Sequence, residues 1–580
     1  MTGRGGRLAR AAVPWALLAG LGLAATGSRM PATATATALA ASGTPERAGA
    51  SSALRGAFDV RDYGAVADGK TKCTDAVRKA IAAARAHGGG TVLFGPGTYL
   101  TGPIRLESHI TLHIDAGARV KFSDDFDDYL PMVRSRWEGT EVVSFSPLIY
   151  ADHVEDVAIE GSGILDGQGE RWWQFHRALR AEQKKTGRWN TDSRWQKEFA
   201  ARNPSLELPD DDSRLKSGFL RPPFVQILDS RRVSIRDVKL VSSPFWTINP
   251  VYCDNVTVRG VTIENPSDAP NTDGIDPESC RNVHISDCLI DTGDDCITIK
   301  SGRDQQGRRI NRPAENTTIT NCTMLHGHGG VVIGSEMSGG VRNLVASNCV
   351  FDGTDRGIRI KSARGRGGVV ENVRMSNIVM RNIVEEAITV NLSYTSAPPE
   401  PVSERTPHFR NIRINGVSGE ADRAGTLQGL PETLLEGVAL VDIDLKARQG
   451  LIVRDARNIS LTGVNVDTTV GPAITAVHVE SLALSDVGTR TPHPKTPVLD
   501  LTDVAGAFVH GCAPGPHTDV FARVAGPDTR SVVFEGNALI FSGPPALAGL
   551  PAVPVQIAPD VRRGAVTGQA SSPPPGPDPR

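Results

Sequence analysis

The sequence predicts an all-β protein that folds as a right-handed parallel β-helix (solenoid) with an N-terminal capping helix. One observation is the composition: the 580 residues include 60 Gly, 39 Pro and only 5% aromatic residues, which suits many short strands and turns. Another is a repeated nine-residue phrase with alternating apolar residues, such as NVTVRGVTI. A third is that no ten-residue amphipathic helix fits between the copies, which argues against βαβ units and leucine-rich repeats.

The repeated phrase begins at Asn255, Asn282, Asn316, Asn343 and Asn372, at intervals of 27, 34, 27 and 29 residues. Periods of this size are typical of solenoids. In a parallel β-helix each coil supplies about three short strands, and equivalent residues of successive coils stack roughly 4.8 Å apart. We therefore expect the asparagines to form a hydrogen-bonded ladder at a turn, and the Val, Ile and Cys residues to form ladders in the interior.

The N-terminus reads as an export signal. Arg4, Arg7 and Arg10 precede the apolar run AAVPWALLAGLGLAA, and an Ala/Thr tract with A-x-A sites follows. A membrane anchor is the alternative, but the run is shorter than the roughly 20 residues of a spanning helix and contains Pro14. We expect residues 1–42 to be a signal peptide and leader, and the protein to be secreted or periplasmic.

The capping helix is predicted within the segment CTDAVRKAIAAARAHGGG. Val77, Ala80, Ile81 and Ala84 fall on one helical face, with Thr74 as the expected N-cap and Gly88 as the end. Such a helix covers the apolar end that a solenoid otherwise exposes.

The expected catalytic domain is residues 56–545, and one long segment in it lacks the coil pattern. This insertion, residues 171–220, is rich in Trp, Arg, Lys and Asp and must leave the stack as a loop or small helical excursion. Residues 546–580 are rich in Pro and Gly and are predicted to be a partly disordered tail.

The eight cysteines match no zinc-ligand spacing. Cys288, Cys322 and Cys349 each lie six residues after a repeat asparagine, so small buried thiols in the core explain them best. One or two disulfides remain open, because export would permit them.

The strands that follow the phrases align with one another. DDCITIKS (Asp294–Ser301), HGGVVIGS (His328–Ser335) and DRGIRIKS (Asp355–Ser362) match residue for residue, and NTDGIDP matches them with Asp273 opposite Asp295. The alternation of a strand then turns Ile297 and Ile299 inward, and Thr298 and Lys300 outward.

The alignment predicts one exterior patch of chemically active groups. Asp273 and Asp295 become neighbours, Asp294 lies beside His328, and Arg359 and Lys361 flank the group. Like charges this close disfavour simultaneous ionisation, and the resulting split supplies a general acid and a general base. Adjacent Arg and Lys would bind an anionic substrate.

Simpler interpretations apply to each group alone. DTGDD is by itself more often a solvated or calcium-binding turn, and a strand with Arg and Lys is more often a solvated face. Their joint occurrence on four aligned coils favours a site. The net charge of -2 gives no reason to expect a nucleic-acid partner.

These residues resemble glycoside hydrolase family 28, the polygalacturonases and their relatives. The four motifs of the family occur in order as Asn271-Thr272-Asp273, Gly293-Asp294-Asp295, Gly327-His328-Gly329 and Arg359-Ile360-Lys361. The resemblance extends from FDVRDYGAVADG near residue 58 to PEPVSERTPHFRNI near residue 412, so it covers most of the mature chain.

The resemblance implies a mechanism. Asp294 would protonate the glycosidic oxygen, while Asp273 and Asp295 would hold and deprotonate the attacking water, with inversion. His328 would assist the acid. The expected substrate-binding residues are Arg359, Lys361, Asn271 and Lys300, the first two holding a galacturonate carboxylate. No metal or organic cofactor is implied.

The resemblance also implies a pectic substrate. Because rhamnogalacturonan-acting relatives tend to depart from the G-H-G and R-I-K motifs, homogalacturonan is favoured over a rhamnogalacturonan. GHGGVVIGSEMSGGVRN resembles the bacterial exo-acting branch, and the insertion could close one end of the groove, so we expect exo action by a monomer with no membrane partner after signal removal. A pectate lyase and a non-catalytic polysaccharide-binding β-helix are the alternatives.

Overall fold

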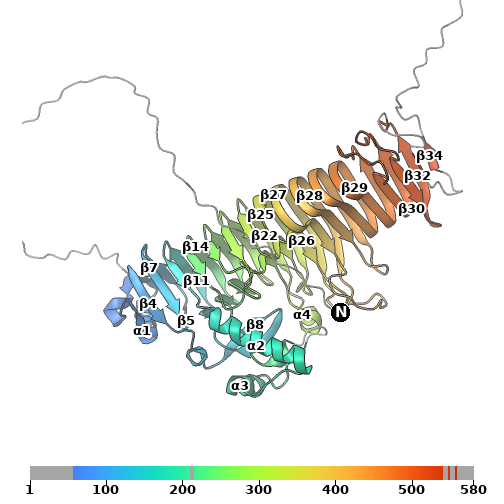
Figure 1. Cartoon of the computed structure of the whole chain (residues 1–580). Helices are drawn as coiled ribbons and strands as arrows, with labels where there is room; N and C mark the ends of the chain where they lie inside the picture. Colours follow the sequence, from blue (N-terminus) through green and yellow to red (C-terminus); the bar gives the residue numbers. More distant parts are fainter. Residues whose placement is uncertain (1–55, 209–213, 540–546, 549–554, 558–580) are drawn as a thin grey trace, which may run out of the picture. The chain divides into compact units, whose positions relative to one another are not determined.

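A computed structural model describes residues 56–208, 214–539, 547–548 and 555–557. The predicted signal peptide and leader, and most of the predicted tail, lie outside the described residues. The described chain forms a right-handed parallel β-helix, as the sequence predicts (Figure 1). The strands of the stack pair in parallel, whereas β8 (Val133–Trp137) and β9 (Thr140–Ser144) form an antiparallel hairpin beside it.

The N-terminal end of the stack is covered by helix α1 (Thr74–Ala86). Its buried face comprises Ala76, Val77, Ala80, Ile81 and Ala84, which includes the four predicted positions. The predicted N-cap was wrong: Cys73 occupies that position, because the Thr74 hydroxyl instead accepts a hydrogen bond from the Gly102 amide at 2.7 Å. Among the described residues, no helix is both long and apolar enough to span a membrane.

The first coils consist of short strands, with two 3-10 turns among them, η1 (Val60–Tyr63) and η2 (Phe126–Tyr129). The strands are β1 (Ala57–Asp59), β2 (Asp68–Lys72), β3 (Gly90–Phe94), β4 (Gly97–Thr101), β5 (Ile104–Arg105), β6 (Ile110–Ile114), β7 (Ala118–Phe122), β10 (Ile149–Asp152), β11 (Glu155–Gly161) and β12 (Ile164–Asp166).

The central coils contain the aligned segments. Their strands are β13 (Val225–Leu228), β14 (Arg231–Arg236), β15 (Lys239–Val241), β16 (Ile248–Val251), β17 (Asp254–Arg259), β18 (Thr262–Glu264), β19 (Arg281–Ser286), β20 (Leu289–Thr292), β21 (Asp295–Ile299), β22 (Ala314–Thr320), β23 (Thr323–His326), β24 (Gly329–Ile333), β25 (Val341–Asp352) and β26 (Arg356–Lys361). The predicted register is confirmed: Ile297 pairs with Val331, which in turn pairs with Ile358. All three side chains are fully buried.

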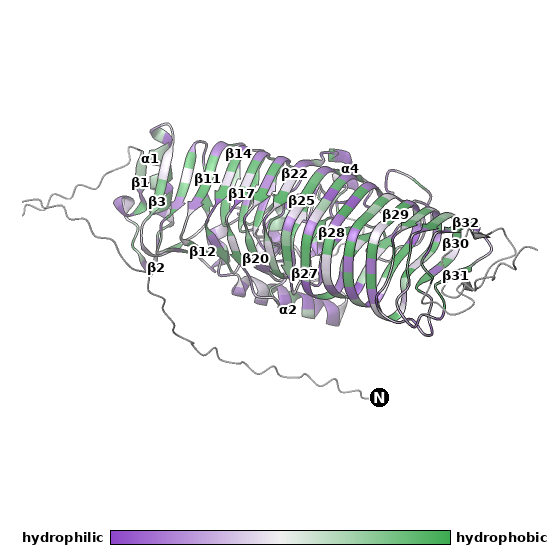
Figure 2. Ribbon diagram, turned by 90° about the horizontal axis from the view of Figure 1, so that it is seen from above, coloured by the Kyte–Doolittle hydropathy of each residue, from purple (hydrophilic) through white to green (hydrophobic). Residues whose placement is uncertain are grey.

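The later coils begin with longer strands that bend around the turns of the helix and end with short ones. They are β27 (Val369–Asn391), β28 (His408–Gln428), β29 (Leu435–Ser485), β30 (Leu499–His510), β31 (Ala522–Ala525), β32 (Arg530–Glu535), β33 (Leu547–Ala548) and β34 (Val555–Ile557). The last two pair with β31 and β32, so coil pairing continues past residue 545, where the sequence predicts the tail to begin. Figure 2 shows the alternation of apolar and polar residues along the strands of the stack.

An asparagine ladder runs along one turn of the stack. The side-chain amides of Asn316, Asn343, Asn372 and Asn411 each donate to the preceding asparagine, at 2.7 to 3.2 Å. The first rung differs from the prediction, because Asn282 donates to Asp254 at 2.9 Å and not to Asn255. The eight cysteines are all buried and free, so no disulfide forms.

The predicted insertion contains helices. α2 (Glu170–Thr186), α3 (Arg194–Arg202) and the 3-10 turn η3 (Leu215–Ser217) lie between β12 and β13, and α4 (Asp304–Ile310) follows β21. α3 begins with a capping box between Ser193 and Gln196. In Figure 1, α2, α3, β8 and α4 all lie on one side of the stack.

Candidate active site

Three carboxyl groups meet on one face of the central coils. Asp273 lies opposite Asp295 on successive coils, since the Gly274 amide donates to the Asp295 carbonyl at 2.9 Å, and Asp294 precedes Asp295 at the start of β21. One carboxylate oxygen from each lies within 4.8 Å of the others. A Cβ on Gly293 would come 2.4 Å from the Ala269 carbonyl oxygen, so only glycine lets the turn approach this closely.

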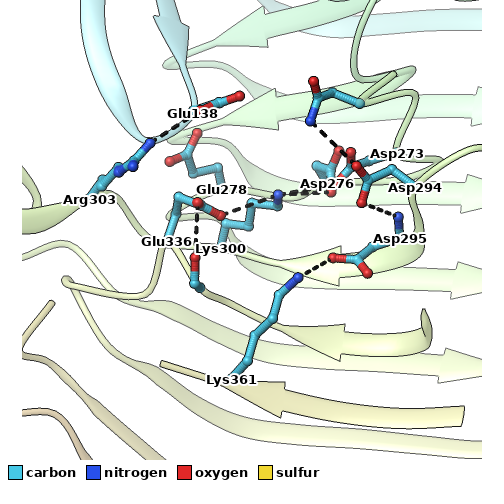
Figure 3. A network of polar contacts seen from close by, with 12 residues as sticks. Glu138, Asp273, Asp276, Glu278, Asp294, Asp295, Lys300, Arg303, Glu336 and Lys361 are labelled. Carbon is cyan, nitrogen blue, oxygen red and sulfur yellow. Dashed lines mark hydrogen bonds and ion pairs between the residues drawn. The ribbon is translucent and has the colours of Figure 1, made fainter. Parts of the chain in front are cut away.

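Asp295 is held in its ionised form. Lys361 Nζ donates to its Oδ2 at 2.6 Å, and Arg359 donates to its Oδ1 at 3.0 Å. Burial works against ionisation, but these two cations outweigh it and hold the pKa of Asp295 below its usual range. Figure 3 shows the contact between Lys361 and Asp295.

Asp273 has a different environment. Burial raises its pKa to about 8, although Lys300 Nζ lies 3.2 Å from its Oδ2. Asp273 Oδ1 is buried and has no hydrogen-bond partner among the described residues. Asp273 and Asp295 are therefore unlike carboxyl groups, with the proton favoured on Asp273.

Asp294 accepts hydrogen bonds from three directions. His328 Nδ1 lies 2.9 Å from Oδ1, the Asp295 amide donates to the same oxygen at 2.9 Å, and the Asn271 amide lies 3.4 Å from Oδ2. The hydrogen bond with Asp294 raises the pKa of His328 to about 9. The imidazole is half-exposed, so this pair borders the open side of the site.

Lys300 occupies a position that sequence alignment alone does not reveal. Its side chain is 4% exposed, and its ammonium contacts Asp273, Asp276 and Glu336 (Figure 3). Burial lowers the pKa of Lys300, but the three carboxyl groups outweigh burial and raise it well above its usual range. The ammonium also lies 3.8 Å from the centre of the Trp246 ring. Lys300 thus supports Asp273 from below the surface.

The site includes residues that the sequence did not single out. Asp273, Asp294, Asp295 and Lys361 line a pocket together with Trp246, Glu336, Tyr394, Glu138 and Arg214. The Tyr394 ring lies 5.6 Å from the Arg359 guanidinium and 5.3 Å from the Lys361 ammonium. Tyr394 follows the last motif by 33 positions in a segment without the coil pattern, so only the fold brings it here.

A stack of aromatic rings forms the wall behind these groups. Trp137 stacks on Phe245 with ring centres 5.0 Å apart, and Phe245 stacks on Trp246 at 5.2 Å. Each ring carries a cation on its face: Arg214 over Trp137, Arg221 over Phe245 and Lys300 over Trp246. Cation–π contact stabilises these cations against the aromatic wall, and Lys300 also contacts Asp273.

The three aspartates do not form a good metal site. Both oxygens of Asp295 are occupied by cationic side chains, and Lys300 takes Oδ2 of Asp273. A Ca²⁺ ion needs six to eight oxygen ligands, and neighbouring ammonium and guanidinium groups would repel it. The donor set therefore favours acid–base chemistry over metal binding.

A β-helix that carries unlike carboxyl groups beside cations defines a class: an enzyme that hydrolyses glycosidic bonds. Comparisons with known proteins agree. Residues 211–468 match the model of glycosyl hydrolases family 28, and residues 57–169 match the model of rhamnogalacturonase A/epimerase, pectate lyase-like proteins.

Individual relatives agree as well. A probable polygalacturonase of Vitis vinifera is 30% identical over 397 residues, which cover 66% of this chain and 73% of the relative. An endo-polygalacturonase of Pectobacterium parmentieri is 30% identical over a match that covers 63% of this chain and 81% of the relative. The solved structure of an exopolygalacturonase from Thermotoga maritima is 37% identical, with a TM-score of 0.59, covering 70% of this chain and 88% of that one. The chain belongs to glycosyl hydrolase family 28.

Proposed function

We propose that the protein hydrolyses α-1,4-galacturonosyl linkages of polygalacturonate, the homogalacturonan backbone of pectin. The observation that carries the proposal is the contrast between Asp295, ionised by Arg359 and Lys361, and Asp273, whose pKa burial raises to about 8. Hydrolysis of a glycosidic bond needs one carboxyl group with a proton and one without. The polygalacturonase relatives support the choice of substrate.

In the proposed mechanism Asp294 protonates the leaving oxygen, because it is the most accessible of the three aspartates and contacts His328. Asp273 and Asp295 hold the attacking water, and Oδ1 of Asp273, which has no partner among the described residues, would accept one of its hydrogen bonds. Before attack the cluster holds one proton, and its movement from Asp273 towards Asp294 would prepare both acid and base.

Arg359 and Lys361 would bind the substrate carboxylate next to the scissile bond. Each keeps donors beyond those it gives to Asp295, since a guanidinium has five N–H groups and an ammonium three. Tyr394 lies against both cations and would contact the face of the same sugar. Asn271 would act chiefly on Asp294, and Lys300 on Asp273, since each side chain contacts that carboxyl group.

The test is digestion of polygalacturonate by the purified protein. We expect new reducing ends, no ultraviolet absorbance from an unsaturated uronide, and no loss of activity in chelator. Absorbance together with chelator sensitivity would instead identify a lyase, and binding without any cleavage would identify a polysaccharide-binding protein.

We further propose exo action, in which the enzyme cleaves only at the ends of the polymer chain. The tip of the β8–β9 hairpin closes one side of the pocket, where the Arg303 amide donates to the Gly139 carbonyl at 3.2 Å and Glu138 pairs with Arg303 and Arg214. The hairpin is anchored to the insertion, because the side chain of Asn203 bonds both the amide and the carbonyl of Val143 at 2.8 Å. A wall of this kind would admit only a chain end.

Early product sizes test the mode of attack. Exo action predicts that monomer or dimer is the only early product, and a ladder of oligomers would show endo action. The names of the relatives leave this point open, because they include both endo- and exo-acting enzymes.

Inversion at the anomeric carbon is also proposed. One oxygen from each of the three carboxyl groups lies within 4.8 Å of the others, closer than the roughly 6.5–9.5 Å between carboxyl groups in most inverting glycosidases. The water would therefore be bound between Asp273 and Asp295, not between widely spaced acid and base. Proton NMR of the first product gives the answer: the β-anomer indicates inversion and the α-anomer retention.

We also propose that the protein is exported from the cytoplasm. The basic and apolar N-terminus precedes the described residues, and a polymeric plant cell-wall substrate requires an enzyme outside the cell. Expression of the full chain, followed by N-terminal sequencing of protein from the medium or periplasm, tests this; uncleaved cytoplasmic protein would contradict it.

A further inference from the structure

Arg221 is a fully buried arginine behind the active site. It lies just before β13, after the helical insertion, and only 1% of its surface is exposed. Its guanidinium lies over the Phe245 ring, 5.1 Å from the ring centre. Burial lowers the pKa of Arg221 to about 9, because removing a guanidinium charge from water is costly.

The hydrogen bonds of Arg221 fix its orientation. One terminal nitrogen donates to the carbonyl oxygens of Pro244, at 2.8 Å, and of Pro270. The other donates to Oδ1 of Asn271 at 2.8 Å. Because the guanidinium is planar, the two proline carbonyls determine where the second nitrogen points.

This arrangement determines the orientation of the Asn271 amide. A guanidinium can only donate hydrogen bonds, so Asn271 must turn its oxygen towards Arg221. Its Nδ2 then faces Oδ2 of Asp294, 3.4 Å away. The flipped amide would place N–H groups against N–H groups on one side and oxygen against carboxylate on the other, and both contacts would be repulsive.

We propose that Arg221 is a positioning residue for Asp294, acting through the Asn271 amide. The inference rests on the proposed function, in which Asp294 is the general acid. His328 and the Asp295 amide hold one oxygen of Asp294, and Asn271 holds the other. With both oxygens held, the carboxyl plane is fixed relative to the bond it must protonate, and general acid catalysis depends on that geometry.

A double-mutant cycle tests the proposal. Arg221→Met retains the packing on Phe245 but removes every donor. We expect it to lower kcat about 10- to 100-fold while changing KM less than about 2-fold, because substrate contacts are untouched. Asn271→Ala should lower kcat at least as much, and the double variant should be no slower than Asn271→Ala alone. If the kcat losses of the two single variants instead multiplied in the double variant, Arg221 would not act through Asn271, and the proposal would be overturned.

A matched control separates the loss of side-chain positioning at the site from a general loss of protein stability. Arg364→Met removes another largely buried guanidinium, which pairs with Glu432 between later coils, and it should leave kcat unchanged. If Arg221→Met does not fold, Asn271→Asp provides the test. Its carboxylate keeps the bond from Arg221 but cannot donate to Asp294, so kcat should fall about 10-fold or more without a lower Tm. Wild-type kcat in Asn271→Asp would overturn the proposal.

Crystal structures of the variants test whether Arg221 orients Asn271 independently of activity. In Arg221→Met we expect the Asn271 side chain to turn away from Asp294 or to adopt two orientations, and an unchanged Asn271 would overturn the proposal. If the wild-type protein released no sugar from polygalacturonate, the proposed function would fail, but these structures would still show whether Arg221 holds Asn271.

Discussion

His328 Nδ1 lies 2.9 Å from Oδ1 of Asp294, on adjacent coils whose backbones are joined by a hydrogen bond from the His328 amide to the Asp294 carbonyl. The two side chains therefore form a pair that the fold itself holds in register. This pair links the protonation of the site to the stability of the coil.

The first prediction concerns pH. The pKa of His328 is raised from 6.5 to about 9, so the pair stabilises the fold fully below pH 6.5, and this stability is lost as the pH rises through about 9. We expect the Tm advantage of wild type over His328→Gln to shrink between about pH 6 and about pH 10. Because the imidazole is half-exposed, the effect should stay below about 1 kcal/mol. A pH-independent difference in thermal scans would contradict the pairing.

The second prediction concerns the acid. Asp294→Asn keeps the side-chain shape but removes the transferable proton, so kcat should fall about 10²- to 10⁴-fold, with binding of polygalacturonate retained. Reducing-end assays and titration calorimetry measure the two effects. Asp291→Asn is the matched control, because Asp291 belongs to the same acidic run but contacts His326 and not the cluster. Normal turnover in Asp294→Asn would remove Asp294 from the mechanism.

The third prediction concerns Lys361. Without its ammonium, Asp295 loses a 2.6 Å ion pair, so the pKa of Asp295 rises. In Lys361→Ala we expect the acidic limb of the kcat/KM profile to move to higher pH, and KM to rise because a carboxylate contact is lost. Lys239→Ala, which breaks only a surface pair with Glu264, should change neither. An unshifted acidic limb in Lys361→Ala would mean that Asp295 does not control it.

The fourth prediction concerns stability. Lys300→Met leaves three buried carboxyl groups without their shared cation, and loss of one partner of a buried ion pair costs about 3–5 kcal/mol. Urea denaturation should report this loss, which should grow with pH because protonation of Asp273 relieves it. The comparison is Arg78→Met, which breaks an exposed pair with Asp75 and should cost less than about 1 kcal/mol.

The fifth prediction concerns the asparagine ladder. Asn343 has a φ of 58° and exchanges hydrogen bonds with Asn316 at 3.2 Å and Asn372 at 3.1 Å. Asn343→Ala loses both bonds and strains the backbone, for a cost of about 2–3 kcal/mol. Asn343→Gly loses the same hydrogen bonds, but glycine tolerates the positive φ. It should therefore be less destabilising than Asn343→Ala in denaturant titrations. Equal losses would mean that backbone conformation contributes nothing at this turn.

The sequence was sufficient for the register of the central coils. Side chains alternate with a period of two, and a one-residue slip would turn Ile297 to the wrong face, so an alignment of the apolar positions also aligns Asp273 with Asp295. The repeat alone is therefore enough to predict that the motif residues lie together on one face.

The sequence was insufficient wherever contacts come from outside the repeat. Lys300 and Lys361 were expected on the exterior, yet both are buried, and Trp246 and Glu336 contact Lys300. The β8–β9 hairpin reaches the site from more than a hundred residues upstream, with no periodic signal. Thr74 was misassigned for the same reason, since its partner is a distant backbone amide.

The proposed acid, base and carboxylate contacts come from single short segments on consecutive coils. The reacting groups are therefore confined to a few neighbouring coils of a longer solenoid. Coils after β28 could be added or removed as whole units, since each pairs with its neighbours through backbone bonds and a shared apolar register. Lengthening the protein in this way would extend the surface offered to a polymer while leaving the reacting groups where they are. In such an architecture, the length of substrate that is recognised and the chemistry performed on it can evolve separately.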